Sequence, residues 1–243
     1  MDGLTLSLVL AALGVAFVHT ALGPDHYVPF VMLARARAWS LRRTLWITAV
    51  CGAGHVLSSL LLGTAGLAAG VALGRLENVE THRGALAAWL LFGLGLAYGL
   101  WGLRHALRQR QGVVLHAHSD HLHLHGSGTG AHHHGHLLHH HHHRAAAAGN
   151  SGTFWTLFLV FVLGPCEPLI PLFMVPASEQ RWGTALVVGG VFAVVTIATM
   201  LAITTMAMLG AARLHLPALE RWTHALAGGV IACSAAAVLF LGA

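Results

Sequence analysis

The chain has little charge and no lysine. Of its 243 residues only 9% are charged, and all 13 basic residues are arginine. Hydrophobic residues make up 56% of the chain, and the mean hydropathy is +0.70. A soluble globular protein needs far more polar surface than this composition can supply. The composition therefore excludes a soluble fold and predicts an integral membrane protein in contact with the lipid bilayer.

Cysteine is also scarce, and its placement argues against a disulfide framework. Cys51, Cys166 and Cys233 each lie inside an apolar stretch rather than in a polar loop. Disulfide-stabilised domains instead carry many cysteines in short, loop-rich chains.

The N-terminus has Asp2 and no basic residues, and its apolar run is longer than a signal-peptide core. We therefore expect no cleaved signal.

Long apolar runs predict six membrane-spanning helices. A hydrocarbon core of about 30 Å needs about 20 apolar residues per helix. The first run is longer than one crossing requires and contains Gly23-Pro24. Proline removes a backbone donor and clashes with the preceding turn, so we expect a broken first helix. The runs cover approximately residues 4–34, 44–74, 84–103, 153–177, 183–210 and 223–242.

Arginine placement predicts the orientation of the chain. Ten of the 13 arginines fall in the loops after the first, third and fifth spans, whereas Arg75, Arg83 and Arg181 fall in the opposite loops. Cytoplasmic loops carry an excess of basic residues, so both termini are expected outside and the long third loop in the cytoplasm, in a bacterial inner membrane. The arginines lie between apolar runs and form no aromatic-and-basic surface pattern suited to phosphate backbones or stacked bases, so nucleic acid is not an expected partner.

The two halves of the chain share a Leu-Gly-Pro motif, at Gly23-Pro24 and at Gly164-Pro165. Each motif lies in the first span of a three-span unit, and an odd number of spans inverts the second unit. We therefore expect an all-α membrane fold of two inverted three-helix repeats with broken first helices. The repeats would cover residues 1–110 and 153–243. The alternative is that these motifs are unrelated kinks, because glycine and proline are frequent in membrane helices.

Several ionisable or thiol side chains within the predicted spans are costly in lipid and mark a candidate metal site. An ionised carboxylate at the bilayer centre costs about 3 kcal/mol, so it must face protein, water or a cation. Neutral imidazoles, carboxylates and thiolates suit nickel, cobalt, zinc or copper better than calcium or magnesium. Singly, a histidine can instead be structural, and a cysteine can be a small buried hydrophobe. The candidate ligands are His19, Asp25, His26, His55, Cys166 and Glu167.

The loop over residues 111–152 is rich in histidine. Such a tract cannot form a core, so we expect it to be disordered and to bind several ions weakly. An internal run among irregularly spaced histidines is not the pattern of an expression tag. In the cytoplasm it would concentrate ions for export, although buffering of imported metal is also compatible. The predicted capture residues are His116, His118, His121, His123, His125, His132, His133, His134, His136, His139, His140, His141, His142 and His143.

The run from His19 to His26 is similar to a known signature. His-Thr-Ala-Leu-Gly-Pro-Asp-His resembles the His-x4-Asp-His signature of nickel/cobalt permeases, and its Leu-Gly-Pro-Asp-His part resembles the urease-accessory UreH branch. The six spans, the histidine-rich loop and the segment 97–104 are similar to NicO/RcnA nickel and cobalt efflux proteins. The resemblance implies that His19, Asp25 and His26 line the ion path and that His55 corresponds to a second-span histidine. Here five residues, not four, separate His19 from Asp25, which changes their relative angle on a helix by about 100°.

Three hypotheses about function follow. The first is a transporter of nickel or cobalt, with export favoured by the loop, protons as a candidate coupling ion and no prosthetic group; zinc or copper would be other cargoes. The second is a metal-delivery, sensing or urease-accessory-like protein that binds metal without transporting it. The third is an intramembrane metalloenzyme, but the sequence carries no recognised catalytic signature, so we expect no enzyme. A homo-oligomer is compatible with each.

A thiol-disulfide carrier is a further resemblance that we weigh and set aside. The Gly-Pro-Cys-Glu-Pro element around Cys166 is similar to membrane carriers of the CcdA/DsbD type. Those carriers have a cysteine in each repeat, whereas the first repeat here has Asp25 at the corresponding position. A relay between two thiols is therefore poorly supported.

Overall fold

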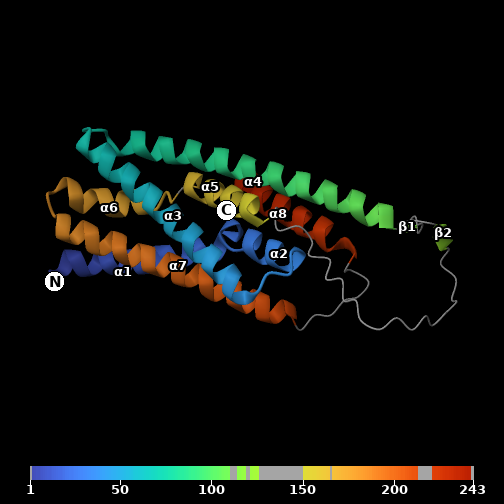
Figure 1. Ribbon diagram of the computed structural model, residues 1–243. Helices are drawn as coiled ribbons and strands as arrows, with labels where there is room; N and C mark the ends of the chain where they lie inside the picture. Colours follow the sequence, from blue (N-terminus) through green and yellow to red (C-terminus); the bar gives the residue numbers. More distant parts are fainter. Residues whose placement is uncertain are drawn as a thin grey trace.

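Long helices lying side by side form the body of the molecule (Figure 1). The computed structural model describes residues 2–109, 114–118, 121–125, 150–164, 166–212 and 221–241. Among them, five helices contain stretches long and apolar enough to cross a membrane. The body of the molecule is therefore helical, as predicted, with five candidate membrane-spanning helices. These helices are α1 (Gly3–Leu22), α3 (Leu41–Ala68), α4 (Leu73–Gln109), α7 (Trp182–Ala212) and α8 (Thr223–Leu241).

Two of the predicted spans are broken into separate elements. The first predicted span consists of α1, a single 3-10 turn η1 (Pro24–His26) and α2 (Val28–Ala36). The other consists of α5 (Asn150–Leu163) and α6 (Leu169–Ser178), which are apolar but individually shorter than the five candidate spans. Gly23 follows the end of α1 and Gly164 follows the end of α5, while Pro165 lies outside the described residues.

Helix α4 is longer than the sequence indicated. The predicted span covered residues 84–103, with Arg75 and Arg83 in a loop, but α4 already begins at Leu73 and includes both arginines. The loop assignment of these two residues was therefore wrong. The charged stretch stays helical because Glu80 and Arg83 form an ion pair at i,i+3 spacing and pack against other helices.

Part of the histidine-rich loop is described as a hairpin. Strands β1 (Val114–His118) and β2 (His121–His125) pair antiparallel, with His116 opposite His123 in the register. Most of the remaining loop, including its predicted capture residues from His132 to His143, lies outside the described residues. The prediction of a disordered capture loop stays a prediction.

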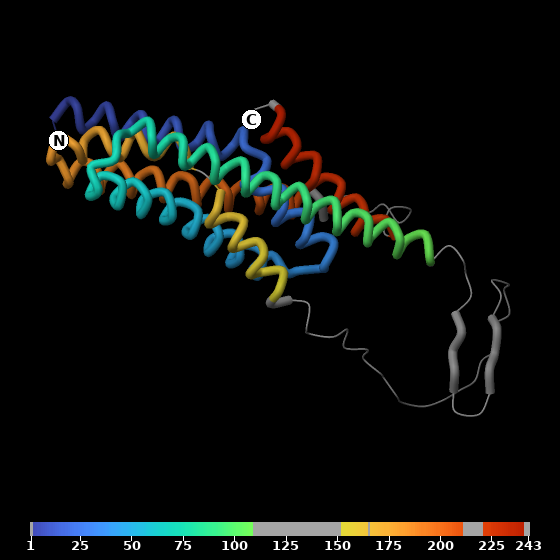
Figure 2. The backbone as a smooth tube through the Cα atoms, turned by 90° about the horizontal axis from the view of Figure 1, so that it is seen from above, coloured from blue at the N-terminus to red at the C-terminus, as the bar shows by residue number. Residues whose placement is uncertain are grey.

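Helices α4 and α8 approach each other closely through glycines. A Cβ added to Gly95 would lie 2.5 Å from the backbone nitrogen of Ala232, and one added to Gly228 would meet the backbone of Gly99. Small residues allow such backbone contact between membrane helices. Helix α8 ends partway along α4, so the N-terminal part of α4 continues beyond it (Figures 1 and 2).

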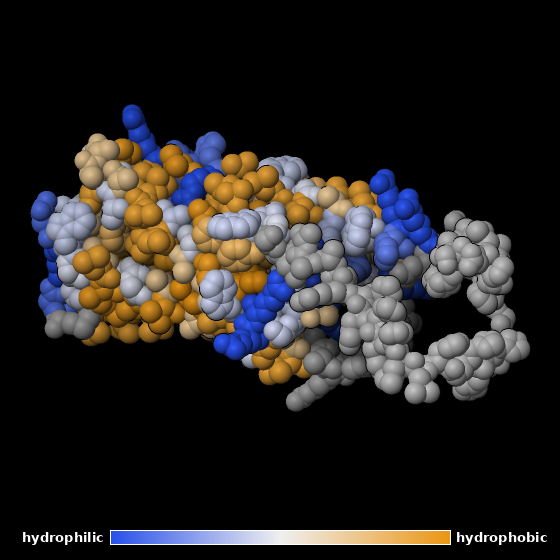
Figure 3. Space-filling view, in the orientation of Figure 1, coloured by the Kyte–Doolittle hydropathy of each residue, from blue (hydrophilic) through white to orange (hydrophobic). Residues whose placement is uncertain are grey.

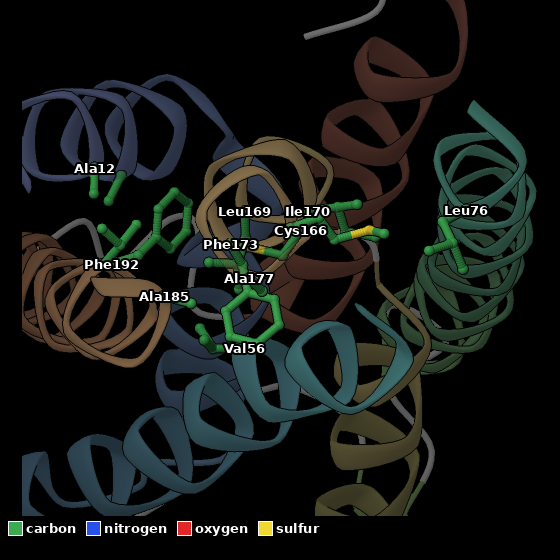
Figure 4. Close-up of a cluster of buried hydrophobic side chains, with 13 residues drawn as sticks. Ala12, Val56, Leu76, Cys166, Leu169, Ile170, Phe173, Ala177, Ala185 and Phe192 are labelled. Carbon is green, nitrogen blue, oxygen red and sulfur yellow. The ribbon is translucent and has the colours of Figure 1, made fainter. Parts of the chain in front are cut away.

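The interior contains two apolar clusters, and the outer surface is apolar as well. One cluster surrounds α6, where Phe173 packs between α3 and α7 (Figure 4). The other includes Phe30, Leu91, Phe161 and Ile231. The visible surface is largely hydrophobic between more polar ends (Figure 3). This pattern fits a protein whose sides face lipid rather than water.

An ion pair and a hydrogen bond connect the N-terminal end of α1 to the start of α7. Asp2 caps α1 by accepting a hydrogen bond from the Thr5 amide at 2.9 Å, and it forms an ion pair with Arg181. The Thr5 hydroxyl lies 3.1 Å from that of Thr184. Hydrogen bonding from Thr5, aided by the Arg181 charge, lowers the pKa of the Asp2 carboxyl. Residues of the two halves of the chain therefore meet at this end of the molecule.

Candidate metal centre

The break in the first span brings two histidines together. The amide of Gly23 donates to the His19 carbonyl at 3.0 Å, which closes the last turn of α1. The 3-10 turn that follows then carries His26 back toward His19, and their ring centroids lie 4.9 Å apart. His26 lies seven positions after His19 in the sequence, and the interruption of the helix places their rings edge to face.

A third histidine comes from α3. The ring centroid of His55 lies 5.2 Å from that of His26, with the rings nearly perpendicular. One ring nitrogen from each of His19, His26 and His55 lies within 4.8 Å of the others. His26 and His55 are buried, and His19 is partly buried. The three predicted histidine ligands therefore form a single cluster inside the bundle.

Hydrogen bonding determines which nitrogen of two of these rings carries the proton. Nδ1 of His26 lies 3.1 Å from Asp25 Oδ1 and 3.2 Å from the Gly23 carbonyl, and Nδ1 of His55 lies 3.3 Å from the Phe161 carbonyl. These neighbours are all acceptors when Asp25 is ionised, so in each ring Nδ1 donates. In a neutral imidazole this leaves Nε2 with a free lone pair.

The Nε2 atoms of all three rings lack partners. Among the described residues, Nε2 of His19, of His26 and of His55 is buried without a hydrogen bond. Buried polar atoms are nearly always paired, and an unpaired one is costly in a membrane interior. A divalent transition metal accepts three imidazole nitrogens and satisfies them together, at about 2.0–2.1 Å each for zinc.

The cluster opens onto a cavity of about 460 Å³. Asp25 and Glu167 both line this cavity along with the three histidines, so five of the six predicted ligands border one space. Asp25 comes from the interruption between α1 and α2, which we call the first break. Glu167 comes from the segment between α5 and α6, which we call the second break. The carboxylates supply negative charge beside a site that would bind a cation.

Asp25 has the geometry of an orienting residue rather than a ligand. Its carboxylate hydrogen-bonds His26 Nδ1, on the opposite side of the ring from Nε2. A carboxylate placed in this way fixes the tautomer of a metal-binding histidine and raises its basicity. The geometry therefore favours His19, His26 and His55 as ligands, with Asp25 supporting His26.

Cys166 is the predicted ligand that lies apart from this cluster. It is fully buried in the apolar cluster around α6 and is not among the described residues that line the cavity (Figure 4). Its amide nitrogen lies 3.3 Å from both Ser59 Oγ and Glu80 Oε2. In this structure Cys166 serves as a small apolar side chain at the second break.

An ion pair that was not predicted from the sequence lies in the interior, close to His55. Glu80 is fully buried and pairs with Arg83, one turn further along α4. Nη2 of Arg83 lies 2.8 Å from the Val162 carbonyl and 3.3 Å from the Gly164 carbonyl. The i,i+3 spacing of opposite charges was visible in the sequence. The position of this pair inside the bundle, however, depends on contacts with Val162 and Gly164, which are far away in the sequence.

The buried apolar cluster that includes Phe30 contributes side chains to the lining of this cavity and of a second one. The second cavity, of about 280 Å³, is lined by residues that include Leu33, Arg37 and Ile231. The rings of Phe30 and Phe161 pack at a tilt of 48° with their centroids 4.6 Å apart, and Phe161 also lines the first cavity. Leu33 and Ile231 belong to the same buried cluster as these rings. Because this one cluster contributes to the lining of both cavities, we expect its side chains to form an apolar layer between them.

The resemblance to nickel/cobalt transporters remains an expectation. No protein-family model, curated protein or solved structure matches this chain.

Proposed function

We propose that this protein transports a divalent transition-metal ion across a membrane, with His19, His26 and His55 as its ligands. The observation that carries the proposal is the clustering of three histidines, with one ring nitrogen of each within 4.8 Å of the others and with every Nε2 buried without a partner among the described residues. A structural histidine within a membrane protein would be expected to use its second nitrogen in a hydrogen bond. Three such nitrogens beside a cavity lined by two carboxylates favour a cation as their common partner.

An inverted repeat would give the site two alternating openings. Helix α1 packs on α7 as α5 packs on α3, and α2 packs on α8 as α6 packs on α4. Helices that occupy corresponding positions in the two halves also contact each other: α3 packs on α7, and α4 packs on α8. This correspondence supports two related three-span units, with the α5–α6 pair as the fourth crossing. Transporters built from inverted repeats bind their substrate near the midplane, at broken helices.

Export of nickel or cobalt is the form of transport that we propose. The arginine distribution favours a cytoplasmic third loop, where its histidines would collect ions on the side from which an exporter loads. The resemblance of the His19–His26 run to nickel/cobalt permeases favours these two metals. Imidazole ligands also suit zinc and copper, so metal identity is the first variable of the test.

The test is metal flux through purified protein in liposomes. Vesicles that contain a metal-sensitive dye report entry of nickel, cobalt or zinc, and cellular metal content provides a second measurement. We expect His19→Ala and His26→Ala to lose flux of the transported metal. His82→Ala is the matched control, because His82 is exposed on α4 and lies outside the cavity lining.

Each outcome discriminates between the hypotheses. Loss of flux in the two cavity variants, with normal flux in His82→Ala, supports transport through the site. Metal binding to the wild-type site without any flux favours a delivery or sensing protein instead. Equal flux in vesicles with wild-type protein and in vesicles without protein, for all three metals, contradicts the proposal.

A further inference from the structure

Glu80 and Arg83 clamp the second helix break from both sides. Arg83 Nη2 contacts the carbonyls of Val162 and Gly164, which lie at the C-terminal end of α5. Glu80 Oε2 lies 3.3 Å from the amide of Cys166, on the other side of the break. Helix ends leave backbone groups without partners, and within a membrane these groups must be satisfied internally. The ion pair provides partners for both ends of the interruption.

Residues of α3 complete the clamp. Ser58 Oγ lies 2.9 Å from Arg83 Nη2, and Ser59 Oγ lies 3.3 Å from Glu80 Oε2. Ser59 also accepts from the Cys166 amide. These serines are one turn beyond His55 on the same helix. The clamp therefore joins α3, α4 and the second break next to a histidine of the cluster.

The clamped segment touches His55 directly. The Phe161 carbonyl, one residue before Val162, accepts the His55 Nδ1 proton and also a hydrogen bond from the Gly164 amide at 3.1 Å. A Cβ added to Gly164 would lie 3.2 Å from His55 Nδ1. A displacement of this segment would thus move the acceptor that orients the His55 ring.

We propose that the Glu80–Arg83 pair is a positioning element for the metal site: it holds the Phe161–Gly164 segment so that the Phe161 carbonyl directs His55 Nε2 into the cluster. The inference rests on the proposed role of the three imidazoles as metal ligands. Arginine suits this task because its planar fork offers several donors in fixed directions, whereas lysine is a point charge on a flexible stem. Mutation of a residue that orients a metal ligand without binding the metal itself typically weakens metal affinity about 10- to 100-fold.

The test is cobalt binding to the full-length protein in detergent. The absorption of bound Co²⁺ reports its ligand geometry, and subtracting the spectrum of His55→Asn removes the contribution of the histidine-rich loop. We expect Arg83→Lys to weaken the remaining component about tenfold and to alter its band shape, with little change in thermal stability. Arg75→Lys, the same change elsewhere on α4, is the matched control and should bind as the wild type does.

A second pair of variants tests the same linkage without touching the charges. Gly164→Ala places a Cβ against His55 Nδ1, whereas Gly152→Ala on α5 has no described atom within 4 Å of its added Cβ. We expect weaker Co²⁺ binding only for Gly164→Ala. This pair carries the test if Arg83→Lys cannot be purified.

The outcomes separate this inference from the proposed function. Absence of a His55-dependent Co²⁺ component in the wild type overturns the metal site itself, and the positioning role with it. A wild-type component that Arg83→Lys leaves unchanged overturns the positioning role alone, as does a loss of stability with unaltered affinity. If Arg83→Lys cannot be purified, unchanged affinity in Gly164→Ala likewise overturns it.

Discussion

Asp25 allows a quantitative test of how the site is built. Its carboxylate lies 3.1 Å from His26 Nδ1, and its side chain is 31% exposed. When Nε2 of His26 binds a cation, the ring becomes more positive and its hydrogen bond to the carboxylate strengthens. A hydrogen bond to a charged group contributes about 1.5–3 kcal/mol. Partial exposure screens this interaction, so the lower part of the range applies here.

These values predict different effects for two substitutions. Asp25→Ala removes the acceptor, and a loss of about 1.5–2 kcal/mol corresponds to metal affinity about 10- to 30-fold weaker. Asp25→Asn keeps an oxygen acceptor of the same shape and loses the charge, so we expect less than about a fivefold change. The His55-dependent Co²⁺ spectrum of the purified protein measures both affinities.

A direct ligand role for Asp25 would give another pattern. An amide is a much poorer metal ligand than a carboxylate, so Asp25→Asn would then weaken binding about as strongly as Asp25→Ala. Equal and large losses would therefore refute the supporting role derived from the hydrogen bond to His26. Unchanged binding in Asp25→Ala would refute any contribution of this carboxylate to the site.

Four further predictions address the loop, the helix packing, the apolar layer and the cavity. Deleting residues 116–143 should preserve flux at saturating metal and reduce it at low metal, as measured in vesicles over a concentration series; complete loss at every concentration would contradict a capture role. Gly228→Leu should lower thermal stability strongly because its Cβ meets the α4 backbone, whereas Gly229→Leu, with no described atom near its Cβ, should not. Phe30→Ala should raise passive Co²⁺ leak by opening the layer between the cavities, and an unchanged leak rate would argue against that barrier. Glu167→Gln should slow maximal flux more than it weakens Co²⁺ affinity, and a selective loss of affinity would make Glu167 a ligand instead.

The sequence was most informative where chemistry is local. His19, Asp25 and His26 surround a Gly-Pro break, and proline geometry alone predicts that an interrupted helix would bring them closer. Hydropathy then located the long helices, because length and apolar composition are properties of a single segment. His55 required a further assumption, that a histidine in the second span faces the same space.

The residues that the sequence missed depend on contacts between distant segments. Residues 75–83 mix acids and arginines and have the composition of a loop, so the sequence predicted no ion pair between Glu80 and Arg83 inside the bundle. Their burial follows from unsatisfied backbone groups at Val162 and Gly164, which become visible only when α4 lies beside the second break. For Cys166 the sequence left a ligand role and a small buried hydrophobe open, and its packing in the apolar cluster favours the second.

The origin of the ligands constrains how metal could drive movement between the two halves. His19, His26 and His55 all belong to the first half of the chain, and the second half reaches this cluster through the Phe161 carbonyl that orients the His55 ring. A ligand shifts a conformational equilibrium only through its differential interaction with the two states. Glu167 is the carboxylate that the second half contributes to the cavity lining among the described residues. Attraction between its charge and a bound cation would depend on how the halves are arranged, which is why neutralising Glu167 is expected to affect flux more than affinity.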